Sequence, residues 1–138
     1  MRILALDHGT VRIGVALSDE LKMIAQPLEF IPTEPFAAFL VRLKELIRER
    51  EVELLVIGMP RNMDGSYGEA AARVREFVTA LREAVPLPLR LWDERLTTAQ
   101  AQRFLREGNV RREDRRDKVD KTAAALLLQN YLDSLTMT

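Results

Sequence analysis

Short hydrophobic runs separated by turn residues characterise the N-terminal part of the chain. Residues 2–7 are mostly apolar, which is typical of a strand buried on both faces of a sheet. Turn residues at 8–11 precede a second apolar run over 12–18, so these segments are predicted to form a hairpin. A third short strand is expected at residues 27–31.

A helical period replaces this pattern after residue 34. Apolar residues recur there at intervals of three and four, which predicts an amphipathic helix within residues 34–50, with Phe36, Phe39, Leu40, Leu43 and Ile47 on its apolar face. Residues 52–57 are then expected to form a strongly apolar strand that ends at Gly58. The last strand is expected at residues 87–92.

Two capping boxes, each a Ser or Thr followed three residues later by Glu or Gln, predict further helices that start near Ser66 and Thr97. The first helix is expected to continue to about residue 84, and the second to stop near residue 108. Residues 109–117 are crowded with charges and nearly devoid of apolar side chains, so we expect a solvated, mobile loop there.

The final helix is expected over residues 119–135, and it is apolar around most of its circumference. The order of elements is a hairpin, a third strand, helix, strand, helix, strand and two helices. Strand-helix-strand units need parallel pairing, whereas the opening hairpin needs antiparallel pairing. The predicted fold class is therefore α/β, with a mixed five-stranded sheet and helices on both faces.

Length and composition narrow the function classes. The 138 residues support one domain, over residues 1–138, with one hydrophobic core. The absence of cysteine excludes disulfides and thiolate metal sites and fits a reducing cytoplasm, and the single histidine excludes multi-histidine sites. We do not expect the N-terminus to be a signal peptide, and no apolar run in the sequence is long enough to cross a membrane. We expect a cytoplasmic protein that is a monomer or a weak dimer.

Four acidic residues occupy positions that are unusual for purely structural carboxylates. Asp7 ends the first strand, Asp93 and Glu94 end the last strand, and Asp120 shares a helical face with apolar residues. A buried carboxylate must be neutralised, paired or bound to a cation. Ligands of open α/β sheets usually bind at strand ends. Converging carboxylates without cysteine favour Mg²⁺ or Mn²⁺ over zinc.

A structural role for each of these acids is an open alternative. Acidic residues at strand ends often cap helices or pair with nearby cations, and Arg12, Arg95 and Lys121 are candidate partners. His8 is expected to pack against its neighbours or to lie at the edge of a substrate site.

Four sequence motifs carry a resemblance to a known family. They are DHGTVRIG at 7–14, GMPRNMDG at 58–65, WDERLTT at 92–98 and VDKTAA at 119–124. In this order they resemble the YqgF family, also called RuvX-like, whose members are regarded as pre-16S ribosomal RNA nucleases or as Holliday junction resolvases. The motifs span nearly the whole chain.

The resemblance implies an RNase H-like fold and divalent-metal cleavage of phosphodiester bonds. It implies catalytic roles for Asp7, Glu94 and Asp120, with Asp93 as a further metal ligand. Many RNase H-like nucleases have an acidic residue at the end of the fourth strand, where this chain has Gly58. Glu94 would supply that charge instead.

Contacts to nucleic acid are expected from two groups of residues. Turn and loop residues near the carboxylates can approach phosphates: Gly9, Arg12, Arg61 and Asn62. Basic residues late in the chain form a candidate clamp: Arg111, Arg112, Arg115, Arg116 and Lys121. The 21 acidic residues balance the 21 basic ones, so any basic surface is local.

The expected function is maturation of the 5′ end of pre-16S ribosomal RNA, with ribosomal precursor particles as partners. One alternative is a DNA nuclease that acts on junctions or single strands. A second is a non-catalytic module that binds RNA or a transcription complex. An actin-like or sugar-kinase-like ATPase shares the opening hairpin motif, but such proteins close two similar domains around ATP, and this chain is long enough for one.

Overall fold

The computed structural model describes residues 1–60, 67–93 and 112–135, with side chains in the last range described from residue 123 onward. The strands are β1 (Arg2–His8), β2 (Arg12–Ser18), β3 (Ala25–Pro32), β4 (Val52–Met59) and β5 (Leu89–Asp93). The helices are α1 (Phe36–Glu49), α2 (Glu69–Ala84) and α4 (Arg112–Leu135).

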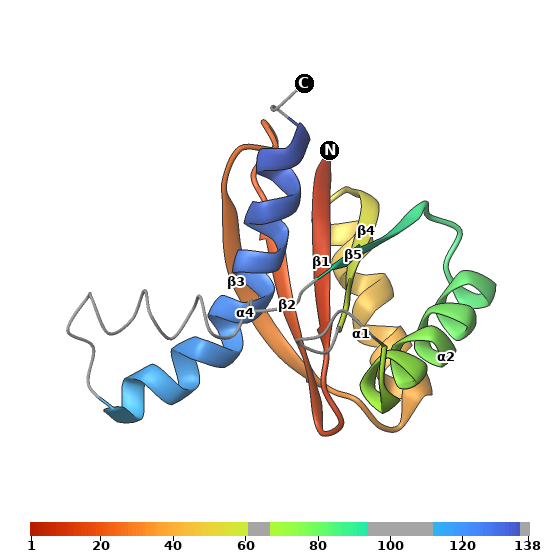
Figure 1. Ribbon diagram of the computed structural model, residues 1–138. Coiled ribbons are helices and arrows are strands. Elements are labelled where there is room, and N and C mark those ends of the chain that lie inside the picture. Colours follow the sequence, from red (N-terminus) through yellow and green to blue (C-terminus); the bar gives the residue numbers. More distant parts are fainter. Residues whose placement is uncertain (61–66, 94–111, 136–138) are drawn as a thin grey trace.

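The five strands form one mixed sheet in the order β3-β2-β1-β4-β5 (Figure 1). β2 is antiparallel to both β1 and β3, whereas β4 is parallel to both β1 and β5. The predicted hairpin and the predicted mixed sheet are therefore confirmed. The parallel arrangement brings the carboxyl ends of β1, β4 and β5 to the same edge of the sheet.

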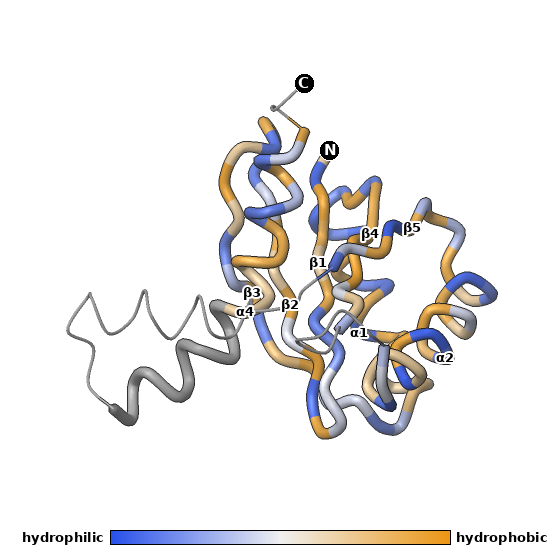
Figure 2. The backbone as a smooth tube through the Cα atoms, in the orientation of Figure 1, coloured by the Kyte–Doolittle hydropathy of each residue, from blue (hydrophilic) through white to orange (hydrophobic). Residues whose placement is uncertain are grey.

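Helices cover both faces of the sheet, with α1 and α2 on one side and α4 on the other (Figure 1). The larger core lies on the α1 and α2 side, where Leu4 and Leu6 of β1 pack with Phe39 and Phe77. Figure 2 shows hydrophobic stretches along the central strands and alternating hydrophilic and hydrophobic stretches around α2. This alternation is the amphipathic pattern from which the helix is predicted.

A smaller core holds α4 against the opposite face. Ala5 of β1 and Ala16 of β2 are fully buried there beneath Leu127 and Leu128. Small side chains on the sheet let the helix approach closely. Gln129 adds a polar anchor, because its side chain accepts a hydrogen bond from the backbone N–H of Ala25 (2.9 Å) and donates one to the carbonyl oxygen of Met23 (2.9 Å).

The predicted charged loop is wrong over residues 112–117, because α4 already begins at Arg112. Arginine, lysine and glutamate have high helix propensity, so a charged segment can extend a buried helix into solvent. The predicted second helix, 97–108, lies outside the described residues.

The predicted capping box at Ser66 is also wrong. The described helix α2 begins at Glu69, with Gly68 as its N-cap in an extended conformation and without a side-chain capping bond. Glycine has low helix propensity, so it readily lies outside the helix and the helix begins after it. The other boundaries agree with the predictions to within two residues, as for β5, expected at 87–92 and found at Leu89–Asp93.

Candidate active site at the carboxyl end of the first strand

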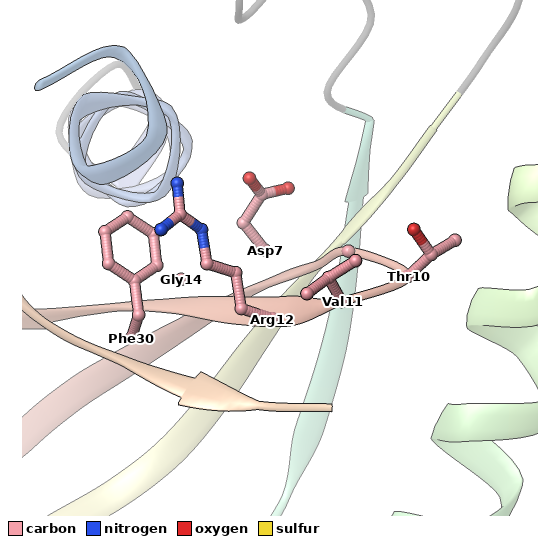
Figure 3. Close-up of a pocket in the computed structure, with 7 residues that line it drawn as sticks. Asp7, Thr10, Val11, Arg12, Gly14 and Phe30 are labelled. Atoms are coloured by element: carbon pink, nitrogen blue, oxygen red, sulfur yellow. The ribbon is translucent and has the colours of Figure 1, made fainter. Parts of the chain in front are cut away.

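Asp7 is the described carboxylate at the centre of the candidate site. It lies near the carboxyl end of β1, and because side chains alternate along a strand it shares the α4 face with Ile3 and Ala5. Figure 3 shows its carboxylate on the same side of the sheet as α4. The Asp7 residue is partly buried, so its side chain contacts neighbouring residues and is also accessible to solvent.

Glycines flank Asp7 on both neighbouring strands. On β2 the residue paired with Asp7 is Gly14. On β4, Ile57 pairs with Leu6, so the next residue, Gly58, comes beside Asp7. Neither neighbour has a side chain, and space is therefore left around the carboxylate.

This space includes a cavity of about 230 Å³, lined by Asp7, Gly9, Thr10, Val11, Arg12, Gly14 and Phe30. The guanidinium carbon of Arg12 lies 4.2 Å from the centre of the Phe30 ring. Figure 3 shows the Arg12 guanidinium between that ring and Asp7. The cavity thus presents a carboxylate and a guanidinium, which suit a cation and a phosphate respectively.

The turn between β1 and β2 is fixed by hydrogen bonds to the connection that follows β3. The Thr33 hydroxyl donates to the Gly9 carbonyl oxygen (2.7 Å), and the Thr33 backbone N–H donates to that of Val11 (3.0 Å). A side chain at Gly9 would place its Cβ 2.5 Å from the carbonyl oxygen of Arg12. Glycine is required here because the backbone approaches so closely.

The end of β5 lies two strands from Asp7, on the far side of β4. Trp92 faces α4, where its ring meets Tyr131 edge to face at 5.4 Å. Asp93 is the next residue, so strand alternation directs it to the opposite face, and it is exposed. β5 therefore brings Asp93 to the same edge of the sheet as Asp7, on the other face.

With this geometry in place, comparisons with known proteins identify the family. The sequence model of RuvX, described as Holliday junction resolvase, matches residues 1–134. The chain belongs to the RuvX family.

Relatives with curated names match this RuvX-family chain over nearly its full length. A protein of Moorella thermoacetica is 51% identical over 135 residues, which cover 98% of this chain and 96% of the relative. A protein of Halothermothrix orenii is 46% identical over 133 residues, covering 96% and 95%. Both bear the name "Putative pre-16S rRNA nuclease".

Solved structures confirm the expected RNase H-like fold. Thermus thermophilus RuvC in complex with a Holliday junction substrate has a TM-score of 0.54 and 17% identity, and the match covers 100% of this chain and 97% of RuvC. The fowlpox virus Holliday junction resolvase has a TM-score of 0.55 and 14% identity, over 98% and 99%. At this identity the likeness concerns the fold alone.

The structure brings together three of the predicted site residues of this RuvX-family chain, namely Asp7, Gly9 and Arg12. Glu94, Arg61, Asn62 and Arg111 lie outside the described residues. Five more residues belong to α4 by their backbone, and their side chains are not described: Arg112, Arg115, Arg116, Asp120 and Lys121.

Asp120 is one helical turn before Ala124, which is fully buried against the sheet. In Figure 1 the C-terminal end of α4 lies at the same end of the sheet as the start of β1, so α4 runs antiparallel to β1. The helix position of Asp120 precedes that of Ala124 by about 6 Å along the helix axis. The predicted roles of Asp93, Glu94 and Asp120 stay predictions.

The chemistry of the donor atoms in the described part of the site fits a divalent cation. Asp7 offers carboxylate oxygens beside two glycines and a cavity, and oxygen is the donor that Mg²⁺ and Mn²⁺ prefer. Among the side chains that the structure describes, those of residues 1–60, 67–93 and 123–135, no group of three or more His, Cys, Asp or Glu is placed to hold a metal. Further ligands would come from predicted residues whose side chains are not described.

Sequence reasoning missed Thr10, Val11, Gly14 and Phe30 as cavity residues. Thr10, Val11 and Gly14 lie inside the DHGTVRIG motif, so that motif could have indicated them. Phe30 could not be found this way, because its place opposite Gly14 depends on the register of β3 against β2.

His8 lies on the face opposite Asp7 and packs against Phe77, with ring centres 4.7 Å apart. Burial lowers the pKa of His8 below its ordinary value of 6.5, the charge of Arg73 lowers it further, and Asp7 opposes both effects. The expected packing role of His8 is therefore confirmed.

No helix in the described part of the chain is long and apolar enough to span a membrane.

Proposed function

We propose that this chain is a divalent-metal-dependent nuclease that cleaves precursor 16S ribosomal RNA in the cytoplasm. The observation that carries the proposal is the cavity at the end of β1, where Asp7 and Arg12 lie together in a protein of the RuvX family. Relatives about half identical to it over nearly the whole chain are named for this activity.

In this proposal Asp7, Glu94 and Asp120 hold Mg²⁺ or Mn²⁺, and Asp93 is not among the ligands because strand alternation directs it to the face of the sheet opposite Asp7. Such an ion, when bound, would activate a water molecule and stabilise the oxyanion that leaves. No side-chain nucleophile is then required. This fits the composition, because the chain has no cysteine and its one histidine packs against Phe77.

The described residues bind and orient the phosphate. The Arg12 guanidinium has its charge beside the Asp7 carboxylate, and stacking on Phe30 limits its movement (Figure 3). Gly9 lets the β1–β2 turn close against the carbonyl oxygen of Arg12, and in this proposal the turn so formed lies beside the phosphate. A phosphate held by Arg12 would have its scissile bond near Asp7.

Basic residues of the second group extend the binding surface beyond the cavity. Arg111 precedes α4, while Arg112, Arg115, Arg116 and Lys121 belong to its first turns. Contacts between these cations and phosphates would make binding weaken as salt concentration rises. Ribosomal precursor particles are the partners that this proposal implies.

A substrate panel tests the proposed function. The purified protein is incubated with precursor 16S ribosomal RNA, single-stranded DNA and a four-way DNA junction, with Mg²⁺, Mn²⁺ or EDTA. Asp7→Asn and Asp120→Asn are compared with Asp133→Asn, a control on the exposed end of α4. All variants are first checked for folding by circular dichroism.

Metal-dependent cleavage of the RNA that is lost in Asp7→Asn and Asp120→Asn, and kept in Asp133→Asn, supports the proposal. Cleavage of the DNA junction alone would favour the resolvase alternative, which agrees with the description of the RuvX family as Holliday junction resolvase. RNA binding without cleavage under every metal condition would favour the non-catalytic module.

A further inference from the structure

A second cavity lies on the face of the sheet opposite Asp7. It has a volume of about 400 Å³, within the range of small-molecule sites, and it is formed by the β1–β2 turn, the β3–α1 connection and α2. We call it the His8 pocket, and its principal lining residues are His8, Thr10, Phe36, Arg73, Glu76 and Phe77. The phosphate and metal chemistry at Asp7 makes no use of it.

Aromatic rings form one wall of the His8 pocket. The ring of Phe77 lies between those of His8 and Phe36, with centre-to-centre distances of 4.7 and 6.2 Å. His8 and Phe36 are partly exposed, whereas Phe77 is only 7% exposed and belongs to the core. A flat ring entering the pocket can therefore contact a rigid aromatic surface.

Donors and acceptors surround this wall. Arg73 supplies guanidinium donors, and Glu76 and Glu34 supply carboxylate acceptors. Thr10 contributes a hydroxyl group that can do either. Two carboxylates and one guanidinium give these side chains a net negative charge, which repels a phosphate group. A neutral flat ring that carries both hydrogen-bond donors and acceptors can stack on the aromatic wall and also form hydrogen bonds with the polar side chains.

Nucleobases have this chemistry. Arginine binds the ring nitrogen and carbonyl oxygen on the edge of guanine, and carboxylates accept hydrogen bonds from amino groups of bases. Unpaired bases of RNA are commonly recognised by stacking on aromatic side chains together with such edge contacts.

The chain path connects the His8 pocket to the candidate active site. Asp7 and His8 are consecutive, so their Cα atoms are about 3.8 Å apart while their side chains point to opposite faces of the sheet. A nucleic-acid strand that has one phosphate beside Asp7 can pass over the β1–β2 turn. A nearby base of that strand then lies beside His8. The turn is held by the Thr33 hydrogen bonds, so this geometry exists before substrate binds.

We propose that the His8 pocket binds an unpaired nucleobase of the nucleic-acid substrate, close to the scissile phosphate. This inference rests on the proposed nuclease function and adds a determinant of cleavage-site choice. The ring of that base would stack against the aromatic wall, and Arg73 and Glu76 would read its edge.

The sequence provides one reporter on each face for a direct test. His8 is the one histidine and Trp92 the one tryptophan of the chain, so proton NMR resolves each ring without assignment of the rest. Nucleosides and a short single-stranded RNA are titrated into the full chain at constant pH in EDTA, where no cleavage is needed. The RNA is also prepared with one abasic nucleotide at each position in turn.

We expect saturable shifts of the His8 ring protons with the RNA, and loss of the shift when one particular base is removed. Arg73→Met should weaken RNA binding seen at His8 by about tenfold, the effect of one lost charged hydrogen bond. Arg75→Met is the matched control, because Arg75 lies on the same helix and stacks on Tyr67, 5.0 Å from the ring centre. It should leave binding unchanged.

Three results would overturn the inference. The first is no shift of His8 with either ligand, or equal shifts of His8 and Trp92 with free nucleosides, which have no phosphate for the Asp7 face. The second is equal weakening by the Arg73 and Arg75 substitutions. The third is a response to free nucleosides but not to RNA, which would make the pocket a site for free nucleosides. Because the test needs no catalysis, a protein that binds the base without cleaving RNA would refute only the proposed function.

Discussion

The two faces of the sheet differ most where β1 ends. On the α4 face, Asp7 has glycines on both neighbouring strands and opens onto a cavity shared with Arg12. On the other face, His8 packs against Phe77, and these two rings with Phe36 form the aromatic wall. Consecutive residues of one strand thus have opposite environments, because their neighbours across the sheet and on the helices differ. The α4 face has a cavity in which charged side chains can bind ligands. The opposite face has packed aromatic rings that stabilise the fold and can stack with a ligand.

The largest effect is expected from removing the aromatic support of the His8 face. Phe77→Ala should lower the free energy of unfolding by about 3–5 kcal/mol, because it empties a well-packed core position. Phe30→Ala, a phenylalanine on the other face, should cost clearly less, since that ring is partly exposed. Urea unfolding of both variants measures the difference, and equal losses would refute this contrast between the faces.

On the Asp7 face the corresponding test is of binding. Arg12→Met should weaken RNA binding by about 1.5–3 kcal/mol, the range for hydrogen bonds to charged groups, with little change in stability because Arg12 is exposed. Fluorescence anisotropy with labelled RNA measures this, with Arg48→Met on α1 as control. If both variants bind as well as the wild type, Arg12 has no part in phosphate binding.

Gly9 lies in the turn that the two faces share. Gly9→Ala should destabilise the protein by about 1–3 kcal/mol, because the new Cβ would lie 2.5 Å from a backbone oxygen that must move. Gly68→Ala is the comparison and should cost less, because Gly68 has φ −110°, which any residue adopts, and loses only the preference for glycine over alanine at the N-cap. Thermal unfolding compares the two, and an unchanged Tm for Gly9→Ala would contradict the close approach seen in the turn.

The smallest effect concerns a surface ion pair that links β3 to α1. Hydrogen bonds from Arg42 hold the pKa of Glu29 below its ordinary value of 4.5. A lowered folded-state pKa stabilises the protein above pH 4.5, and this contribution is lost as the pH falls through 4.5 toward the lowered value.

Glu29→Gln should therefore flatten the acid dependence of stability, by less than about 1 kcal/mol because solvent screens the partly exposed pair. Unfolding curves between pH 7 and pH 3 measure it, beside the exposed α2 variant Glu83→Gln. An acid limb as steep as that of the wild type would exclude this role of Glu29.

Much of the fold is predictable because the strands and helices carry clear periods. Residues 2–7 read as a buried strand, and β1 is indeed covered on both faces. Local signals failed where two interpretations compete. The charges of residues 112–117 suit both a solvated loop and an extended helix, and Gly68 outweighs the capping signal of Ser66.

The candidate site is predictable only where its residues adjoin in sequence. Asp7, Gly9 and Arg12 lie in one motif and share one cavity. Phe30 and the glycine neighbours of Asp7 come together through strand register, and the His8 pocket comes from three separate segments. Long-range pairing of this kind leaves no local pattern in the sequence.

The central claim is that the Asp7 face performs cleavage, and a single-turnover assay tests it most directly. Precursor 16S ribosomal RNA is mixed with excess protein and Mn²⁺ or Mg²⁺, and the rate is compared for wild type, Asp7→Asn and Asp133→Asn. We expect Asp7→Asn to fold normally and to cleave at least about a hundredfold more slowly, as for a lost metal ligand, while Asp133→Asn keeps the wild-type rate. Cleavage by folded Asp7→Asn at the wild-type rate would contradict the account.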